Sequence, residues 1–407
     1  MTSHIMPTYG RLPVTFEKGE GVWLWDQSNK RYLDALSGIA VCNLGHAHPA
    51  ISQAISQQSK TLLHTSNLYG IATQENLADE LIKKSAMDNV FFCNSGAEAN
   101  EAAIKIARLY GHQQGFEKPC ILAMEKSFHG RTMGTLSATG NSKIQDGFSP
   151  LVEGFVHVPF NNIAAINKAI AENNIVAIMV EPVQGEGGVN IPDADYLNQI
   201  RDICDQHQSL LIMDEVKTGF RVAKGGAQEL YGIKADLTTY AKAMGNGYPV
   251  AAFGGRADVM DVISFNAKGV THGGTYTANM IALSAAKATL TILNETDAYE
   301  TINKVGAEIQ QVLSRVFTKH GIEHRFAGPG SMFGIHFGDL VPTNYRDWKQ
   351  TDSDLYTEFA MNLIKHGIML EPDSREPWFI CESHKDVDLV WLEEIADRSM
   401  AEAIAAK

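Results

Sequence analysis

Short apolar segments alternate with amphipathic segments through the middle of the chain. Amphipathic patterns over Ala97–His112 and Asp195–His207 repeat apolar residues at helical spacing, as helices with one buried face do. The apolar segments, rich in Val, Ile and Phe, are the candidate strands Asn89–Cys93, Cys120–Met124, Gly154–Val158, Ile175–Glu181, Ser209–Asp214 and Val250–Gly254. This alternation predicts an α/β fold with a mostly parallel sheet covered by helices.

The two ends of the chain have a different pattern. After about Thr301, long helical patterns surround a short alternating strand, Ser331–Gly338, and a further helix is predicted from Asp352 to a terminating Gly367. The first residues contain a strand pattern at Gly21–Trp25, which we expect to pack against the C-terminal part. The expected division is an N-terminal segment over 1–48, a large domain over 49–300 and a small α+β domain over 301–407.

Composition and charge narrow the possible functions. A chain of 407 residues is long enough for two domains. Lys and Arg number 34 against 47 Asp and Glu, so the net charge of -13 argues against nucleic acid as a partner, and any phosphate must be held locally. Five cysteines without a CxxC pair predict reduced thiols and a cytoplasmic location. No apolar run is long enough to span a membrane, and no targeting segment is expected.

Three local features could carry chemistry. Asn94-Ser95-Gly96-Ala97 stands between a strand and a helix, where free amide groups bind a phosphate or where a serine simply caps the helix. Asp214 ends an apolar strand, where it either lies at a ligand site or is simply exposed to solvent. Lys242 follows an apolar run and precedes small residues, so it is either a surface lysine or a desolvated nucleophile.

Together these features are the parts that hold pyridoxal 5′-phosphate. A lysine forms the imine, a carboxylate keeps the ring nitrogen protonated, and a helix end binds the phosphate. Phe128-His129-Gly130-Arg131 adds a flat ring that could stack on the pyridine and a guanidinium that could bind a carboxylate, although each residue alone is also typical of core or surface. His46 and His48 lack a third ligand at suitable spacing, so no metal site is predicted.

Beyond these residue types, the chain resembles the class III, fold-type I pyridoxal-phosphate aminotransferases. From about residue 7 to residue 201 it is similar to acetylornithine and ornithine aminotransferases, through the motifs Tyr32–Val41 (YLDALSGIAV), Asn94–Glu101 (NSGAEANE), Phe128–Thr132 (FHGRT) and Glu181–Gly188 (EPVQGEGG). From Asp214 onward, the segment DEVKTGFR is more similar to glutamate-1-semialdehyde aminomutases and their aminotransferase relatives.

The resemblance implies a fold and a set of cofactor contacts. The fold is a large, mostly parallel sheet domain of the seven-stranded type, with a smaller α+β domain built from both chain ends. It also implies a homodimer, in which Thr275 reaches the phosphate of the neighbouring subunit. The implied cofactor contacts are Ser95, Gly96 and Ala97 at the phosphate, Phe128, His129 and Val216 around the ring, Asp214 at the ring nitrogen and Lys242 at the imine.

Two departures from the acetylornithine type concern the substrate side. Lys217 stands where that type has a glutamine that contacts the ring hydroxyl, so a cation there either stabilises the phenolate or points away. The arginine that binds an α-carboxylate before an Ala-Pro-Pro motif is missing, and Arg375 either replaces it or forms a surface ion pair. The resemblance leaves Arg131 to anchor a substrate carboxylate, while Glu186 pairs with a movable arginine.

The predicted reaction is the transfer of an amino group by a ping-pong cycle in which Lys242 moves the proton. The expected donor is an amino acid with a terminal amine, such as acetylornithine, ornithine, γ-aminobutyrate or a β-amino acid, and the expected acceptor is 2-oxoglutarate or pyruvate. Two alternatives stay open at this point: an aminomutase of the glutamate-1-semialdehyde type, and a scaffold that keeps the fold without catalysis. The sequence leaves the donor unassigned.

Overall fold

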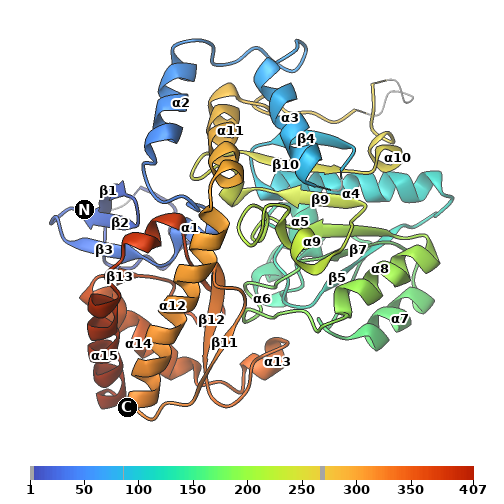
Figure 1. Ribbon diagram of the computed structural model, residues 1–407. Helices are drawn as coiled ribbons and strands as arrows, with labels where there is room; N and C mark the ends of the chain where they lie inside the picture. The colour runs from blue at the N-terminus through green and yellow to red at the C-terminus, as the bar shows by residue number, and fades with distance from the viewer. Residues whose placement is uncertain (1–3, 86, 266–270) are drawn as a thin grey trace.

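A seven-stranded sheet forms the centre of the computed structural model, which describes residues 4–85, 87–265 and 271–407 (Figure 1). In sheet order the strands are β4 (Asn89–Cys93), β10 (Ala251–Gly255), β9 (Leu237–Tyr240), β8 (Leu210–Asp214), β7 (Ile175–Val180), β5 (Cys120–Met124) and β6 (Phe155–Val158). In this order, all neighbouring strands from β9 to β6 are parallel, and β10 runs antiparallel to both of its neighbours. The predicted α/β fold with a mostly parallel sheet is confirmed.

All six predicted strands are present within one residue, but β9 was not predicted as a strand. Its sequence, Leu-Thr-Thr-Tyr, is short and half polar, yet all four residues are buried. The threonines are tolerated inside because their hydroxyl groups are hydrogen-bonded: Thr238 accepts from Gln228, and Thr239 donates to Asn100. Tertiary partners therefore make a central strand from a segment whose pattern alone does not indicate one.

Helices cover both faces of this sheet. Helix α4 (Gly96–Gln113) packs its alanine-rich face on one side, while α7 (Ile163–Glu172) and α8 (Tyr196–His207) cover the other (Figure 1). Helix α4 starts immediately after β4, so its N-terminus lies at one end of the sheet. The connection places the first turn of α4 beside the ends of β8 and β9, where the candidate site lies.

The smaller α+β part contains residues from both ends of the chain (Figure 1). Strand β13 (Ile368–Met369) pairs in parallel with β3 (Arg31–Asp34), and β1 (Phe16–Glu20) and β2 (Trp23–Asp26) complete that sheet. A second sheet holds β11 (His324–Ala327), β12 (Met332–Phe337) and β14 (Trp378–Phe379), packed by α12 (Ala298–Lys319), α14 (Ser353–His366) and α15 (Leu389–Ala405). The division at residues 48 and 300 stays a prediction.

Strand β12 differs from the pattern that the sequence shows. Its alternation is typical of a half-buried strand, but all six residues are buried. Phe333, Ile335 and Phe337 belong to the core with α12 and α14, and Met332 packs with Val189 and other residues of the large domain. The second face is buried because the two domains meet there.

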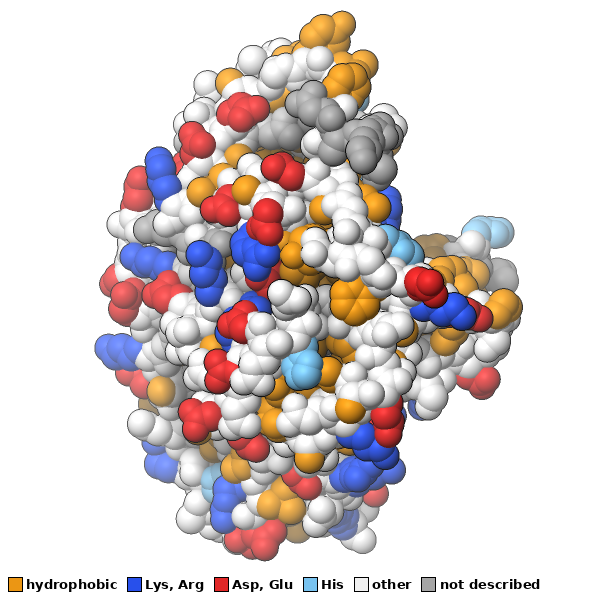
Figure 2. Space-filling model, turned by 90° about the vertical axis from the view of Figure 1, so that its right-hand side faces the viewer, with side chains coloured by type: hydrophobic (Ala, Val, Ile, Leu, Met, Phe, Trp, Pro, Cys, Tyr) orange, Lys and Arg blue, Asp and Glu red, His pale blue; other side chains and the backbone are white. Residues whose placement is uncertain are grey.

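Charged side chains of both signs are interspersed over the face shown in Figure 2. In the part of the chain that the structure describes, no helix has the length and apolar character needed to cross a membrane. Figure 2 shows no broad surface of one sign on this face.

Candidate active site

A cavity of about 280 Å³ opens where the carboxyl ends of β7, β8 and β9 meet the first turn of α4. Ligand sites in α/β sheets are typically found at such strand ends. The cavity brings together most of the residues that the sequence singled out. Its lining consists of Gly96, Ala97, Asn100, Phe128, His129, Gly130, Arg131, Glu181, Asp214, Val216, Lys217, Ala241 and Lys242.

Asp214 is held by neighbours from three elements. Asn100 Nδ2 donates to its Oδ2 over 2.8 Å, and His129 Nδ1 lies 2.8 Å from the same oxygen. The backbone N–H of Val216 donates to Oδ1 over 3.0 Å. Burial alone lowers the pKa of His129, but the hydrogen bond and negative charge of Asp214 outweigh it, so the pKa of His129 is raised. His129 therefore orients Asp214, and the carboxylate is fixed within the cavity.

Lys242 stands directly after β9, at the start of a short 3-10 turn over Lys242–Met244. Its φ of 47° is in the left-handed region, which is uncommon for a residue with a side chain. Burial lowers its pKa to about 8, and the positive charge of Lys217 acts in the same direction. A lysine in this environment keeps a larger neutral fraction than an exposed lysine and so is a better nucleophile.

The first turn of α4 is capped by a side chain, and two of its residues line the cavity. Ser95 Oγ accepts from the backbone N–H of Glu98 over 3.2 Å, and Glu98 Oε2 accepts from Ser95 N over 2.9 Å. The first amide groups of a helix have no partner within it, and Gly96 and Ala97 both line the cavity. The structure confirms that Ser95 caps the helix, and phosphate binding by the neighbouring amides stays a prediction with which this cap is compatible.

The residues present fit pyridoxal phosphate. Asp214 supplies an acceptor for a ring nitrogen, Lys242 an amine, and the start of α4 amide donors for a phosphate. A Cβ atom at Gly96 would lie 2.9 Å from both methyl groups of Val216, so glycine is required for the close approach of these two residues. Phe128 and Val216 both line the cavity and can bound a flat ring.

Lys217 and Glu376 form a buried ion pair at this cavity. Lys217 Nζ lies 3.2 Å from Glu376 Oε2, and the two side chains are 8% and 17% exposed. The charges of this pair, of Arg131 and of Lys242 act on Glu186, whose pKa is raised mainly by burial. Burial also raises the pKa of Glu181 to about 7, and Glu181 accepts from the backbone N–H of Phe128 over 3.0 Å.

Of the three remaining predicted residues, Arg131 lines the cavity, whereas Arg375 and Thr275 do not. Arg131 lines the cavity and is exposed, with its guanidinium 5.6 Å from the Phe128 ring centroid. Arg375 Nε donates to both carboxylate oxygens of Asp373 over 2.9 Å, so it is in an ion pair and is not among the described residues that line the cavity. Thr275 is exposed and also lies outside this lining.

Asn100, Glu181 and Glu376 belong to the site but do not stand out in the sequence as site residues. Asn100 donates to both Asp214 and the backbone oxygen of His129, and it lies one helical turn after Gly96, inside the NSGAEANE motif. Glu181 likewise lies inside the EPVQGEGG motif. Glu376 adjoins the predicted Arg375, but nothing in the sequence pattern distinguishes it as a partner of Lys217.

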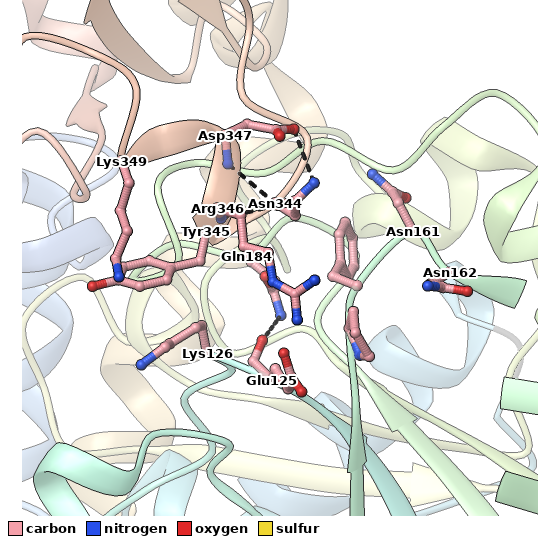
Figure 3. A pocket seen from close by; sticks show the side chains of 12 residues that line it. Glu125, Lys126, Asn161, Asn162, Gln184, Asn344, Tyr345, Arg346, Asp347 and Lys349 are labelled. Atoms are coloured by element: carbon pink, nitrogen blue, oxygen red, sulfur yellow. Dashed lines mark hydrogen bonds between the residues drawn. The ribbon is translucent and has the colours of Figure 1, made fainter. Parts of the chain in front are cut away.

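A larger cavity of about 450 Å³ lies beyond β5 and β6 and is bordered by α13 (Tyr345–Trp348) (Figure 3). Gln184 donates to the backbone oxygen of Glu125, and the ammonium groups of Lys126 and Lys349 lie 4.5 and 5.2 Å from the Tyr345 ring centroid. Neither Lys242 nor Asp214 lines this cavity, so the amine and carboxylate chemistry belongs to the smaller cavity.

Comparison with known proteins identifies the family. Residues 5–383 match the model of the Aminotransferase class-III family. The chain is 49% identical over 346 residues to the acetylornithine aminotransferase of Nitrosomonas europaea, covering 84% of this chain and 87% of that protein. It is 44% identical to the acetylornithine aminotransferase of Methanocaldococcus jannaschii over 328 residues, covering 80% and 81%.

Solved structures agree with these relatives. N-acetylornithine aminotransferase from Stenotrophomonas maltophilia superposes with a TM-score of 0.80 at 28% identity and 98% coverage of both chains. Ornithine aminotransferase from Toxoplasma gondii gives a TM-score of 0.89 at 26% identity, covering 99% of this chain and 94% of that one. The chain therefore belongs to the class III aminotransferases, which are pyridoxal-phosphate-dependent transaminases, and it has their fold.

Proposed function

We propose that this aminotransferase moves the terminal amino group of acetylornithine to 2-oxoglutarate. The observation that carries the proposal is the shared cavity of Lys242, Asp214 and Arg131, which joins an amine, a ring-nitrogen acceptor and an exposed cation. The names of the relatives at 49% and 44% identity support acetylornithine as the donor. Ornithine, γ-aminobutyrate and β-amino acids are the other donors to compare, and pyruvate is the other acceptor.

Each residue has a defined task in this proposal. Bound in the cavity, pyridoxal phosphate supplies an electron-withdrawing ring that accepts negative charge from the substrate carbon. Lys242 holds the cofactor and then carries the proton at its Nζ; with a pKa of about 8, about a quarter of its amine is neutral at pH 7.5. Asp214 keeps the ring nitrogen protonated, and His129 and Asn100 keep Asp214 in place.

The start of α4 and the walls of the cavity hold the cofactor. Amide groups of Gly96 and Ala97, with the Ser95 hydroxyl, bind the phosphate. Phe128 and Val216 both line the cavity and would bound the ring and keep water from it.

Substrate recognition rests on Arg131 and Glu186. Arg131 is exposed at the cavity and can bind a carboxylate in a bidentate manner. Arg131 and Glu186 are close enough to interact electrostatically, and in this proposal Glu186 attracts the guanidinium when no carboxylate is bound. The Asp373–Arg375 ion pair supports Arg375 as a structural residue rather than a second carboxylate anchor.

The proposal includes a homodimer in which Thr275 reaches the partner's phosphate. Thr275 is exposed, and Leu68, Tyr69 and Tyr276 are exposed apolar side chains at 86%, 71% and 66%. Such exposure is typical of a surface that a second copy covers. Light scattering in solution tests the dimer, and a monomer that binds the cofactor fully would refute the role of Thr275. The five free cysteines support a reducing, cytoplasmic location.

A donor and acceptor panel tests the reaction itself. Acetylornithine should bleach the visible band of the cofactor-loaded enzyme, and 2-oxoglutarate should restore it. Arg131→Ala should raise the KM for every carboxylate substrate about tenfold or more, and Lys143→Ala, a change at a surface lysine, serves as the control. Product formation without any added keto acid would instead indicate the aminomutase, and unchanged KM values in Arg131→Ala would refute the assignment of Arg131.

A further inference from the structure

The ion pair between Lys217 and Glu376 joins the two domains beside the active-site cavity, which Lys217 lines. Lys217 follows β8 of the large domain, and Glu376 lies between β13 and β14 of the small domain. Lys217 Nζ is 3.2 Å from Glu376 Oε2 and 3.5 Å from Oε1. Both side chains are largely shielded from water, at 8% and 17% exposed, so the interaction is screened far less than a surface ion pair.

The position of the Lys217 ammonium is constrained by its surroundings. A side chain at Gly185 would overlap the ammonium group, so Lys217 is packed directly against the backbone of the loop after β7. Burial alone lowers the pKa of Lys217, but the negative charges of Glu376, Glu186 and Glu181 outweigh it, so its pKa is raised. Lys217 is therefore a fixed positive charge near neutral pH.

That fixed charge lies beside Lys242, because both lysines line the same cavity. Two ammonium groups in one poorly hydrated space repel each other, and a carboxylate in contact with one of them offsets the repulsion. Several charged or titratable groups line the cavity with Lys242 or act on it electrostatically. They are Lys217 and Asp214 at the end of β8, Glu186 and Glu181 after β7, His129 and Arg131 after β5 and Glu376 from the small domain, whereas α4 contributes only uncharged residues to the lining.

We propose that Lys217 and Glu376 are positioning residues that set the protonation of Lys242 from opposite sides, Lys217 favouring its neutral amine and Glu376 its ammonium. The inference rests on the proposed role of Lys242 in holding the cofactor. Burial is the largest influence on Lys242, and among its charged neighbours Lys217 lowers its pKa while Glu376 raises it. Because the opposing carboxylate comes from the small domain, the proton on Lys242 depends on contact between the two domains.

The two partners of one ion pair allow a sharp test. Lys217→Gln and Glu376→Gln remove the same contact, so a purely structural role predicts similar effects from both variants. The electrostatic role predicts effects of opposite sign. Lys217 keeps Glu181 and Glu186 nearby in Glu376→Gln, so it stays charged there and acts on Lys242 without its direct counter-charge.

The measurement is a pH titration of the visible absorbance of the cofactor-loaded enzyme, without any amino donor. The midpoint of this titration is the pH at which half of the molecules carry a proton on the Lys242 nitrogen. We expect the midpoint to rise by about 1 pH unit in Lys217→Gln and to fall by about 1 unit in Glu376→Gln, with Lys217→Arg close to the parent enzyme. Arg315→Gln and Glu393→Gln, which break an exposed ion pair in the small domain, should leave it unchanged.

Shifts of the same sign, or no shift in either variant, would overturn the proposal and leave the pair a structural contact. Where a variant loads too little cofactor, the apoenzyme gives the second readout: the rate at which acetic anhydride labels Lys242 as a function of pH, quantified by mass spectrometry. The same opposite shifts are required. Neither readout uses a substrate, so an incorrect donor assignment would leave the result of this test unaffected.

Discussion

Replacing Asn100 with aspartate should make cofactor binding strongly dependent on pH. Asn100 is 1% exposed, and its Nδ2 donates over 2.8 Å to both Asp214 Oδ2 and the backbone oxygen of His129. Asn100→Asp keeps the shape but puts a second carboxyl group against Asp214. At an effective dielectric constant of about 20, two carboxylates about 4 Å apart repel by about 4 kcal/mol, equivalent to about 3 pKa units. The pair should therefore keep one proton up to about pH 7.

Above that pH, the repulsion and the lost hydrogen bonds should weaken cofactor binding by roughly 100-fold, and acidification to about pH 6 should recover most of the affinity because the retained proton restores one donor. Cofactor affinity is measured by absorbance titration of the apoenzyme from pH 6 to pH 9. The control is Asn43→Asp, since Asn43 is also fully buried but its amide donates to the Phe220 backbone oxygen, away from Asp214. An Asn100→Asp enzyme whose affinity follows the same pH profile as the parent enzyme would refute the role given to Asn100.

Three further changes test the surroundings of the site. Ser95→Ala removes the cap of α4 and should lower the free energy of unfolding by about 1 kcal/mol, measured by a urea titration. The same change should weaken phosphate binding to the apoenzyme. Unchanged phosphate binding would show that the hydroxyl serves only as a cap. Gly96→Ala should push Val216 toward the ring site, because the added Cβ would lie 2.9 Å from its methyl groups, so cofactor affinity should fall while circular dichroism stays constant. Burial alone lowers the pKa of His46, but its 2.6 Å contact with Asp34 and its interaction with Cys42 together outweigh this and raise the pKa to about 10 from 6.5. The stabilisation is complete below pH 6.5 and is lost as pH rises toward about 10, so the stability difference between His46→Gln and the parent enzyme should narrow over that interval; a constant difference would contradict it.

Local patterns were sufficient for much of the fold. Helix α14 runs from Ser353 to His366, with Asp352 as its cap and Gly367 in the left-handed conformation that ends it, as the sequence predicted. These features succeed because capping and glycine geometry depend on a few adjacent residues. Burial of Thr239 in β9 could not be predicted in this way, because its hydroxyl finds its partner on α4, 139 residues away in the chain.

Partners that are distant in the chain also explain why the contacts on the substrate side of the site could not be predicted from the sequence. Lys217 stands out locally because it follows the strand that ends in Asp214, but its counter-charge, Glu376, is 159 residues away. Arg375 and Glu376 belong to a turn closed by the Glu376 N–H and the Asp373 oxygen; within it Arg375 bonds Asp373, while Glu376 reaches Lys217. Adjacent residues therefore have different surroundings, which no residue-type argument could separate. Because Arg131 lines this cavity, while Arg375 is paired with Asp373 and its neighbour Glu376 is paired with Lys217, recognition of a substrate carboxylate should depend on Arg131 and not on Arg375.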